Sequence, residues 1–312
     1  MASSKQDPAE YIQPLHMNGM SGRMMVAPST KGAKREILAL YGHHSSLERW
    51  WGLVQNLQEM GNVTMPDLPG FGGMDSFYTI GERATLDQYA DYLAAFIKMR
   101  YKRRRVSILG ISFGFLVVTR MLQRYPELAN RIDMLVSAVG FTHFDEFRFS
   151  KRRMRGYRLA SKLIAIPPVA FVFRYVALNK YVLSRVYART HNAKHKFKQA
   201  GGDKDLFDRM MDMEVQLWQT NDVRTHWETT KQMLYVDNVG TSIDLPIWHV
   251  FTPHDNYFDN NVIEQHMRII FSDFIPAPIT SVAHAPSVVA DKQEASILVP
   301  RKLRAALSRT GK

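Results

Sequence analysis

The segment Gly110-Ile111-Ser112-Phe113-Gly114 decides the fold, because it places a serine between two glycines where the secondary structure changes. A β-branched run at 106–109 precedes it, and an apolar pattern with helical spacing follows it. A sharp strand-to-helix turn needs glycine two residues either side of the serine, since a Cβ there would collide with the neighbouring strand or helix. The helix would also point its free N–H groups at an anion formed beside the serine. The segment therefore predicts that Ser112 is a nucleophile.

Strand and helix patterns alternate on both sides of this turn. Apolar runs predict strands at 37–41, 63–65, 106–110, 132–139, 247–252 and 279–282, and a hairpin around Asn18-Gly19 is expected to open the chain. Helical spacing predicts helices at 47–57, from Thr85 to 97, from Ser112 to near Pro126, at 260–271 and at the C-terminus. This alternation predicts an α/β fold: a mostly parallel sheet of about eight strands with helices on both faces.

From residue 141 to residue 242 the alternation stops, and the sequence becomes helical, aromatic and basic. We therefore expect an N-terminal extension (1–23), a core made of 24–140 and 243–312, and a helical cap inserted at 141–242. Residues 148–204 contain fifteen Lys and Arg and one acid, Asp203, which gives this segment +14 in a chain of net charge +12.

Basic and apolar residues alternate in the insertion, a pattern that suits an amphipathic lid touching an anionic membrane or gathering amphiphilic substrates. An ordinary cap whose apolar face covers the active site explains the pattern equally well. The basic run at 102–105 follows a helix pattern, so we interpret it as a solvated helix C-terminus and expect no nucleic-acid partner.

Composition excludes several classes of chemistry. Cysteine is absent, which rules out disulfides, thiolate metal sites and thiol catalysis. His43-His44 has no accompanying motif of metal ligands, so no metal is expected. The N-terminus lacks the apolar core of a secretion signal, and the apolar run at 163–173 is shorter than the ~20 residues that span a bilayer. We expect a soluble, cytoplasmic protein, with contact at a membrane surface as the alternative.

Asp255 and His284 follow predicted strands, and their side chains could activate the hydroxyl of Ser112. Asp255 comes just after the strand at 247–252, and His284 just after the strand at 279–282. Reactive groups collect at the carboxyl ends of parallel strands. An imidazole can take the proton of a serine hydroxyl, and a carboxylate fixes the tautomer of that imidazole. We expect Ser112, His284 and Asp255 to form a catalytic triad. Asp259 and the more distant Asp145 are alternative acids, and His254 is interpreted as a polar loop residue.

With these residues the chain resembles the α/β-hydrolase superfamily, specifically a serine hydrolase with a cap domain, over residues 24–305. The shared motifs are Leu40-Tyr41-Gly42-His43, the loop Asp67-Leu68-Pro69-Gly70-Phe71-Gly72 and the late Asp255/His284 pair. The resemblance implies that the backbone N–H groups of His43 and Phe113 form the oxyanion hole. Tyr41 departs from the family, which usually has histidine there.

The resemblance also narrows the reaction. Relatives that cleave epoxides or carbon–halogen bonds use an aspartate where this chain has Ser112, so those reactions are set aside. We expect a serine hydrolase that cleaves an ester, or a related acyl bond, of a small to medium apolar substrate without a cofactor. The alternatives are a lipid hydrolase or acyltransferase docked on a membrane by the basic cap, a carbon–carbon bond hydrolase, and a non-enzymatic binding member of the fold. The sequence does not indicate an oligomeric state.

Overall fold

The centre of the protein in the computed structural model is one eight-stranded sheet with the order β1-β2-β4-β3-β5-β6-β7-β8. The structure describes residues 7–178, 181–183, 185, 203–280, 284 and 286–309. The strands are β1 (Ile12–Met17), β2 (Met20–Ala27), β3 (Glu36–Leu40), β4 (Asn62–Pro66), β5 (Val106–Ile111), β6 (Ile132–Ala138), β7 (Ile243–Phe251) and β8 (Phe271–Pro278). β2 pairs antiparallel with β1 and β4, and every other pairing is parallel. The predicted fold class is confirmed.

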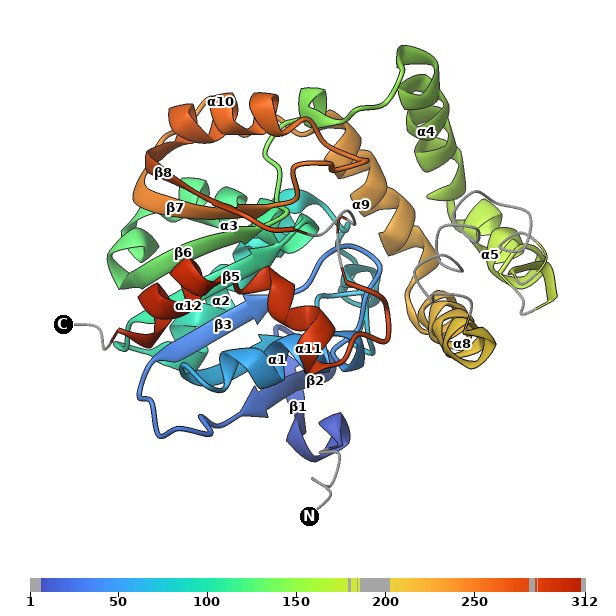
Figure 1. The fold of residues 1–312 in the computed structure, drawn as a ribbon. Coiled ribbons are helices and arrows are strands. Elements are labelled where there is room, and N and C mark those ends of the chain that lie inside the picture. Colours follow the sequence, from blue (N-terminus) through green and yellow to red (C-terminus); the bar gives the residue numbers. More distant parts are fainter. Residues whose placement is uncertain are drawn as a thin grey trace.

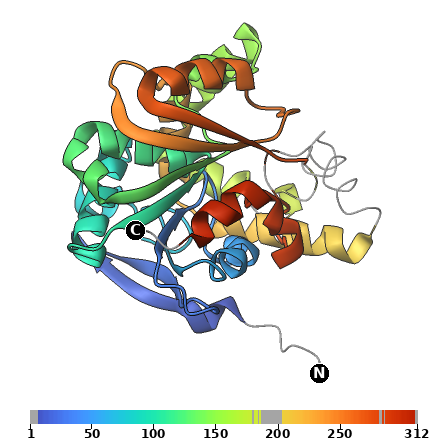
Figure 2. The same cartoon turned by 60° about the vertical axis from the view of Figure 1, so that its left-hand side comes forward.

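Helices cover both faces of the sheet, as Figures 1 and 2 show. In the described residues the α-helices are α1 (Trp51–Leu57), α2 (Leu86–Tyr101), α3 (Phe113–Arg124), α4 (Lys151–Ile164), α5 (Pro167–Val176), α8 (Lys204–Thr220), α9 (Val223–Tyr235), α10 (Asn260–Ile270), α11 (Lys292–Ala295) and α12 (Arg301–Ser308). α1 lies with α11 and α12 on one face, and α2 packs beside α3 on the other.

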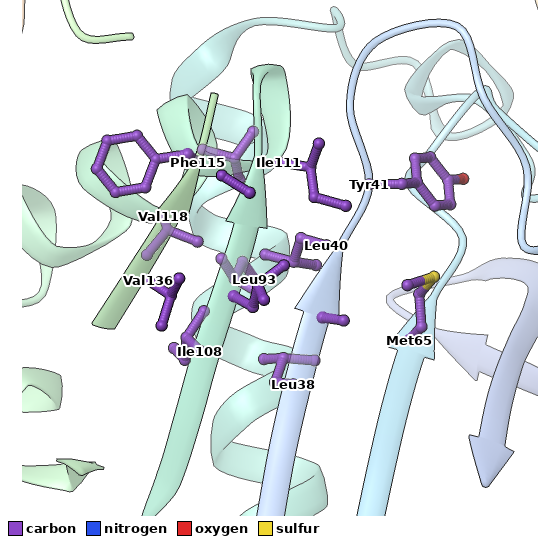
Figure 3. Close-up of a cluster of buried hydrophobic side chains, with 14 of the residues drawn as sticks. Leu38, Leu40, Tyr41, Met65, Leu93, Ile108, Ile111, Phe115, Val118 and Val136 are labelled. Atoms are coloured by element: carbon purple, nitrogen blue, oxygen red, sulfur yellow. The ribbon is translucent and has the colours of Figure 1, made fainter. Parts of the chain in front are cut away.

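The strand that leads to Ser112 is the best buried part of the sheet. All six residues of β5 are buried, as expected for a strand covered by helices on both faces. Figure 3 shows Ile108 and Ile111 of β5 among side chains of β3, β4, β6, α2 and α3. The turn after β5 is therefore held in a rigid apolar surrounding, which fixes the position of Ser112.

Two sequence predictions, the hairpin at Asn18-Gly19 and the strand at 279–282, can be compared closely with the structure. The hairpin is present, with Asn18 and Gly19 at φ values of 53° and 77°, the left-handed region that a tight hairpin turn requires. The strand predicted at 279–282 is wrong where it is described: β8 ends at Pro278, and 281–282 lie outside the described residues. The prolines at 276 and 278 interrupt the apolar pattern by which a strand is predicted, so the sequence did not indicate β8. They are tolerated because β8 is the edge strand of the sheet.

The chain between β6 and β7 contributes α4, α5, α8 and α9, which Figure 1 shows on one side of the sheet. The expected insertion boundaries, 141 and 242, stay a prediction. Five of the fifteen Lys and Arg at 148–204 lie outside the described residues: Lys180, Arg189, Lys194, Lys196 and Lys198. In the described part of the chain no single helix is long and apolar enough to cross a membrane. α4 and α5 together reach that length and composition, but they are bent by 101° at their junction.

Candidate active site

Ser112 occupies a strained turn between β5 and α3. Its φ is 48° and its ψ is −113°, in a region that non-glycine residues rarely adopt. Strain of this kind persists only where the surrounding structure imposes it, and it gathers at functional sites. The turn presents the hydroxyl beside the N-terminus of α3, where the positive end of the helix dipole lies.

The two glycines of the segment give the turn the space it needs. A Cβ on Gly110 would lie 2.6 Å from Cα of Phe115, and a Cβ on Gly114 would lie 2.5 Å from the carbonyl oxygen of Tyr41. Both contacts are with backbone atoms, which cannot move aside as the end of a flexible side chain can. The steric requirement inferred from the sequence is present in the structure.

The structure brings Ser112, His284 and Asp255 together from three separate strand ends. His284 Nδ1 lies 2.6 Å from Asp255 Oδ2, and His284 Nε2 lies 3.4 Å from Ser112 Oγ. An ionised carboxylate only accepts hydrogen bonds, so Nδ1 carries the proton and the lone pair of Nε2 faces the serine hydroxyl. Serine–histidine contacts are often this long before substrate binds.

Asp255 is buried and well supplied with hydrogen bonds. Its Oδ1 accepts bonds from the backbone N–H groups of Tyr257 (2.7 Å) and Phe258 (3.1 Å). Burial alone would raise the pKa of the Asp255 carboxyl, but the hydrogen bond from His284 and these N–H groups outweigh burial and hold the pKa below its usual value. Asp255 is thus ionised at neutral pH and orients His284.

The alternative acids have other neighbours in the described residues. Asp259 caps α10, where its Oδ1 accepts a bond from the N–H of Asn261. Asp145 is exposed, with its carboxylate 3.8 Å from Nδ1 of His143. His254 is an exposed loop residue, as its sequence position suggested. Of these candidates, Asp255 is the one that the described structure pairs with His284.

The loop after β3 lies against the serine turn. A Cβ on Gly42 would sit 3.3 Å from Cβ of Ser112, so this loop approaches the serine closely. The rings of His43 and Phe113 make an edge contact at 5.8 Å between centroids. Phe113 is the first residue of α3, so its N–H has no acceptor within the helix. The two residues expected to supply oxyanion donors are therefore adjacent at the site.

His43 connects this loop to α9. Its Nε2 lies 2.8 Å from Thr229 Oγ1 and 3.2 Å from the carbonyl oxygen of His226. A carbonyl only accepts, so Nε2 carries a proton. Burial lowers the pKa of His43 to about 4, and the bond to the His226 carbonyl offsets this only in part, so the ring is neutral. The sequence did not indicate that His226 and Thr229 contact His43, because helical spacing does not show which loop a helix packs against.

Tyr41, the departure from the family pattern, has a defined role. Its hydroxyl donates to Asp67 Oδ1 (2.8 Å) and accepts from the N–H of Leu68 (2.8 Å). Arg23 donates to the other carboxylate oxygen of Asp67 at 3.0 Å. Burial raises the pKa of Asp67 to about 7, although Arg23 and Tyr41 act in the opposite direction. The tyrosine thus joins the loop after β3 to the loop after β4.

The loop after β4 in turn holds the α8–α9 junction. Asn221 Oδ1 accepts a hydrogen bond from the N–H of Gly72 (2.8 Å), and the N–H of Asp222 donates to the carbonyl of Gly70 (2.9 Å). The Pro-Gly-Phe-Gly motif therefore fixes the α8–α9 junction against the loop after β4. In the described residues, no group of three or more His, Asp or Glu side chains is arranged to hold a metal ion.

Comparisons with known proteins agree with this architecture. The sequence model of the family described as "alpha/beta hydrolase fold" matches residues 37–163. No curated protein sequence matches the chain. Among solved structures, an esterase from Rhodococcus sp. ECU1013 aligns with a TM-score of 0.64 at 15% identity, over 96% of this chain and 100% of that one. The enol-lactonase from Burkholderia xenovorans LB400 aligns with a TM-score of 0.60 at 13% identity, over 96% and 97%.

Proposed function

The chain has the α/β-hydrolase fold, and we propose that within this fold it is a serine hydrolase that cleaves carboxylic esters of small to medium apolar acyl substrates. One observation carries the proposal: His284 bridges Asp255 and Ser112, with its two ring nitrogens facing one partner each. The names esterase and enol-lactonase of two structural neighbours support the same reaction class.

The reaction begins with attack by Ser112 on the ester carbonyl. As Oγ bonds to the carbonyl carbon, its proton moves to Nε2 of His284, and the resulting imidazolium is stabilised by Asp255. The carbonyl oxygen becomes an oxyanion, which accepts hydrogen bonds from the backbone N–H groups of His43 and Phe113. One such donor typically contributes about 10²–10³ in rate. The N-terminus of α3 adds a favourable field at the same place.

The intermediate then collapses to an acyl-enzyme. His284 returns its proton to the leaving alkoxide, the carbon–oxygen bond breaks, and the alcohol departs. Water enters, His284 removes a proton from it, and the hydroxide attacks the acyl carbon. A second collapse regenerates the Ser112 hydroxyl and releases the acid. Every proton in this cycle passes through Nε2 of His284, so no cofactor is required.

A fluorophosphonate probe tests the nucleophile, because it labels activated serines. We expect the wild-type chain to be labelled and Ser112→Ala to remain unlabelled. Ser161→Ala is the matched control: Ser161 is buried in α4, its hydroxyl donates to the Arg158 carbonyl, and its loss should leave labelling intact. Equal labelling of wild type and Ser112→Ala would overturn the nucleophile assignment.

A series of p-nitrophenyl esters of increasing acyl length tests the substrate class. Turnover should rise with chain length and then fall where the acyl group becomes too long for the acyl-binding site. Hydrolysis that Ser112→Ala retains in full would contradict the mechanism. A labelled Ser112 without turnover of any ester in the series would instead point to another acyl bond.

A further inference from the structure

The outer surface of α4 and α5 is apolar to an extent found nowhere else in the described protein. Nine of the fifteen large apolar side chains that are exposed in the described residues fall between Lys151 and Val176; these nine are Tyr157, Leu159, Leu163, Ile166, Val169, Phe171, Val172, Tyr175 and Val176. Phe171 is 64% exposed and Tyr175 62% exposed, and their rings are in contact. Contiguous exposed apolar surface of this kind marks a contact with another molecule or a membrane.

α5 presents this surface without any polar interruption. Its exposed residues are all proline, valine, phenylalanine or tyrosine. Its single cation, Arg174, donates to the backbone carbonyls of Gln219 and Asn221 and is thereby held against the α8–α9 junction. Figure 1 shows α4 and α5 on the outer side of α9, away from the sheet. The apolar face of α5 therefore points away from the catalytic core.

α4 continues the same surface and adds positive charge. Arg152, Arg155, Leu159 and Leu163 follow at spacings of three and four, so they share one helix face. Ile166, in the break between α4 and α5, is also exposed, as are three valines of α5. α4 carries six Lys and Arg and no acid, and none of these six forms an ion pair with a described carboxylate. The sequence has no Asp or Glu from residue 147 to residue 202.

We propose that α4 and α5 form a docking surface for an anionic lipid bilayer. In this arrangement α5 lies in the plane of the interface with its apolar face among the acyl chains, and the exposed Arg152 and Arg155 of α4 contact lipid phosphates. Aromatic and aliphatic side chains on one face with Lys and Arg beside them are the features of an interfacial helix. The 101° bend and the α4 charges fit a pair lying on the surface, not one crossing it.

The same observations disfavour two other occupants. A nucleic acid would pair its phosphates with α4 but would leave the whole exposed face of α5 in water. A second copy of this chain would cover α5 but would bring two sets of α4 cations together, and juxtaposed like charges oppose association. A bilayer with anionic headgroups can cover the apolar face of α5 with acyl chains and pair the α4 cations with phosphates at the same time.

Vesicle sedimentation tests the proposal. The Ser112→Ala chain should sediment with vesicles of phosphatidylcholine containing about 30 mol% phosphatidylglycerol, and should be released as NaCl rises from about 50 to 500 mM. Pure phosphatidylcholine vesicles should bind at least about tenfold less. Because Ser112 is replaced, binding is measured independently of hydrolysis. Equal binding to both vesicles, or tighter binding to a single-stranded RNA oligomer, would overturn the proposal.

Matched variants assign the binding to this surface. Arg152→Gln with Arg155→Gln should reduce partitioning about 10- to 30-fold, since each cation near a membrane contributes roughly fivefold. The exposed cations Arg103 and Lys302, changed together to Gln, serve as control. Phe171→Ser with Tyr175→Ser should reduce partitioning by about tenfold or more, whereas Met99→Ser with Ile269→Ser, exposed apolar residues elsewhere, should not.

The side chains replaced in the test and control pairs are all exposed, so each pair should leave the circular dichroism spectrum unchanged. In the chain that keeps Ser112, each pair should also leave turnover of a soluble p-nitrophenyl ester unchanged. If the test pair and its control pair reduced partitioning onto the anionic vesicles equally, the binding would not belong to the α4–α5 surface. A concentration-dependent dimer, seen by sedimentation velocity, that the Phe171/Tyr175 variant abolishes would also overturn the assignment.

Discussion

Thr229 Oγ1 lies 2.8 Å from Nε2 of His43, so a helix of the insertion holds the loop beside Ser112 by a side chain of that loop. The backbone N–H of the same histidine is assigned to the oxyanion hole. Thr229 is itself fixed, because its hydroxyl donates to the carbonyl of Thr225 at 2.7 Å. A displacement of α9 would therefore move His43 and, with it, the loop beside Ser112.

This connection predicts that Thr229→Val lowers kcat for p-nitrophenyl esters by about tenfold or more, because a small displacement of an oxyanion donor has a large effect on rate. The substitution keeps the shape of the side chain and removes the nearer of the two acceptors of His43 Nε2, leaving the His226 carbonyl at 3.2 Å. Thr230→Val is the matched control. Thr230 also donates to a helix carbonyl, that of His226, but makes no bond to His43. An equal loss in both variants would show that helix stability, not the position of His43, sets the rate.

The acid of the triad is tested by a pair of substitutions four residues apart. Asp255→Asn should lower kcat by about 10³–10⁴, because a neutral amide no longer fixes the tautomer of His284. Asp259→Asn should leave kcat within about twofold, since asparagine caps a helix as well as aspartate. Steady-state kinetics on one ester measures both. The reverse pattern would transfer the role of the acid to Asp259.

The sequence was sufficient to predict most of the central sheet, because buried parallel strands are continuous apolar runs and the turn at Ser112 has a steric signature at Gly110 and Gly114. It also placed Asp255 just after a strand, where β7 ends. His284 was placed after a strand expected at 279–282, whereas β8 ends at Pro278 and His284 lies in the loop beyond it. β8 was misplaced because its prolines break the strand pattern, while only the position of the strand at the sheet edge makes them acceptable. The partnership of His43 with Thr229 could not be predicted, since the two residues are far apart in the chain and no local pattern links them.

Gly114 and Gly156 offer a third matched pair. Gly114→Ala places a Cβ against backbone oxygens, and it should lower the free energy of unfolding by about 3 kcal/mol or more, the scale of severe steric mutations. Gly156 is exposed in α4 with nothing within 4 Å of an added Cβ, so Gly156→Ala should raise helix stability by about 0.5–1 kcal/mol. Urea denaturation measures both. A stabilised Gly114→Ala variant would contradict the close approach of α3 to the loop after β3.

The Tyr41–Asp67 contact predicts a pH-dependent stability. The pKa of Asp67 is raised to about 7, so the unfolded chain loses this proton first and stability falls as pH rises from about 4 to about 7. Tyr41→Phe removes a donor to the carboxylate, so it should cost about 2 kcal/mol at pH near 8.5 but about 1 kcal/mol near 5.5, where Asp67 is protonated. Tyr92→Phe is the control, because Tyr92 donates to the backbone carbonyl of Asp67 (3.0 Å), which does not titrate. Its cost should be equal at both pH values. A Tyr41→Phe cost that does not change with pH would show that Asp67 keeps one charge state throughout.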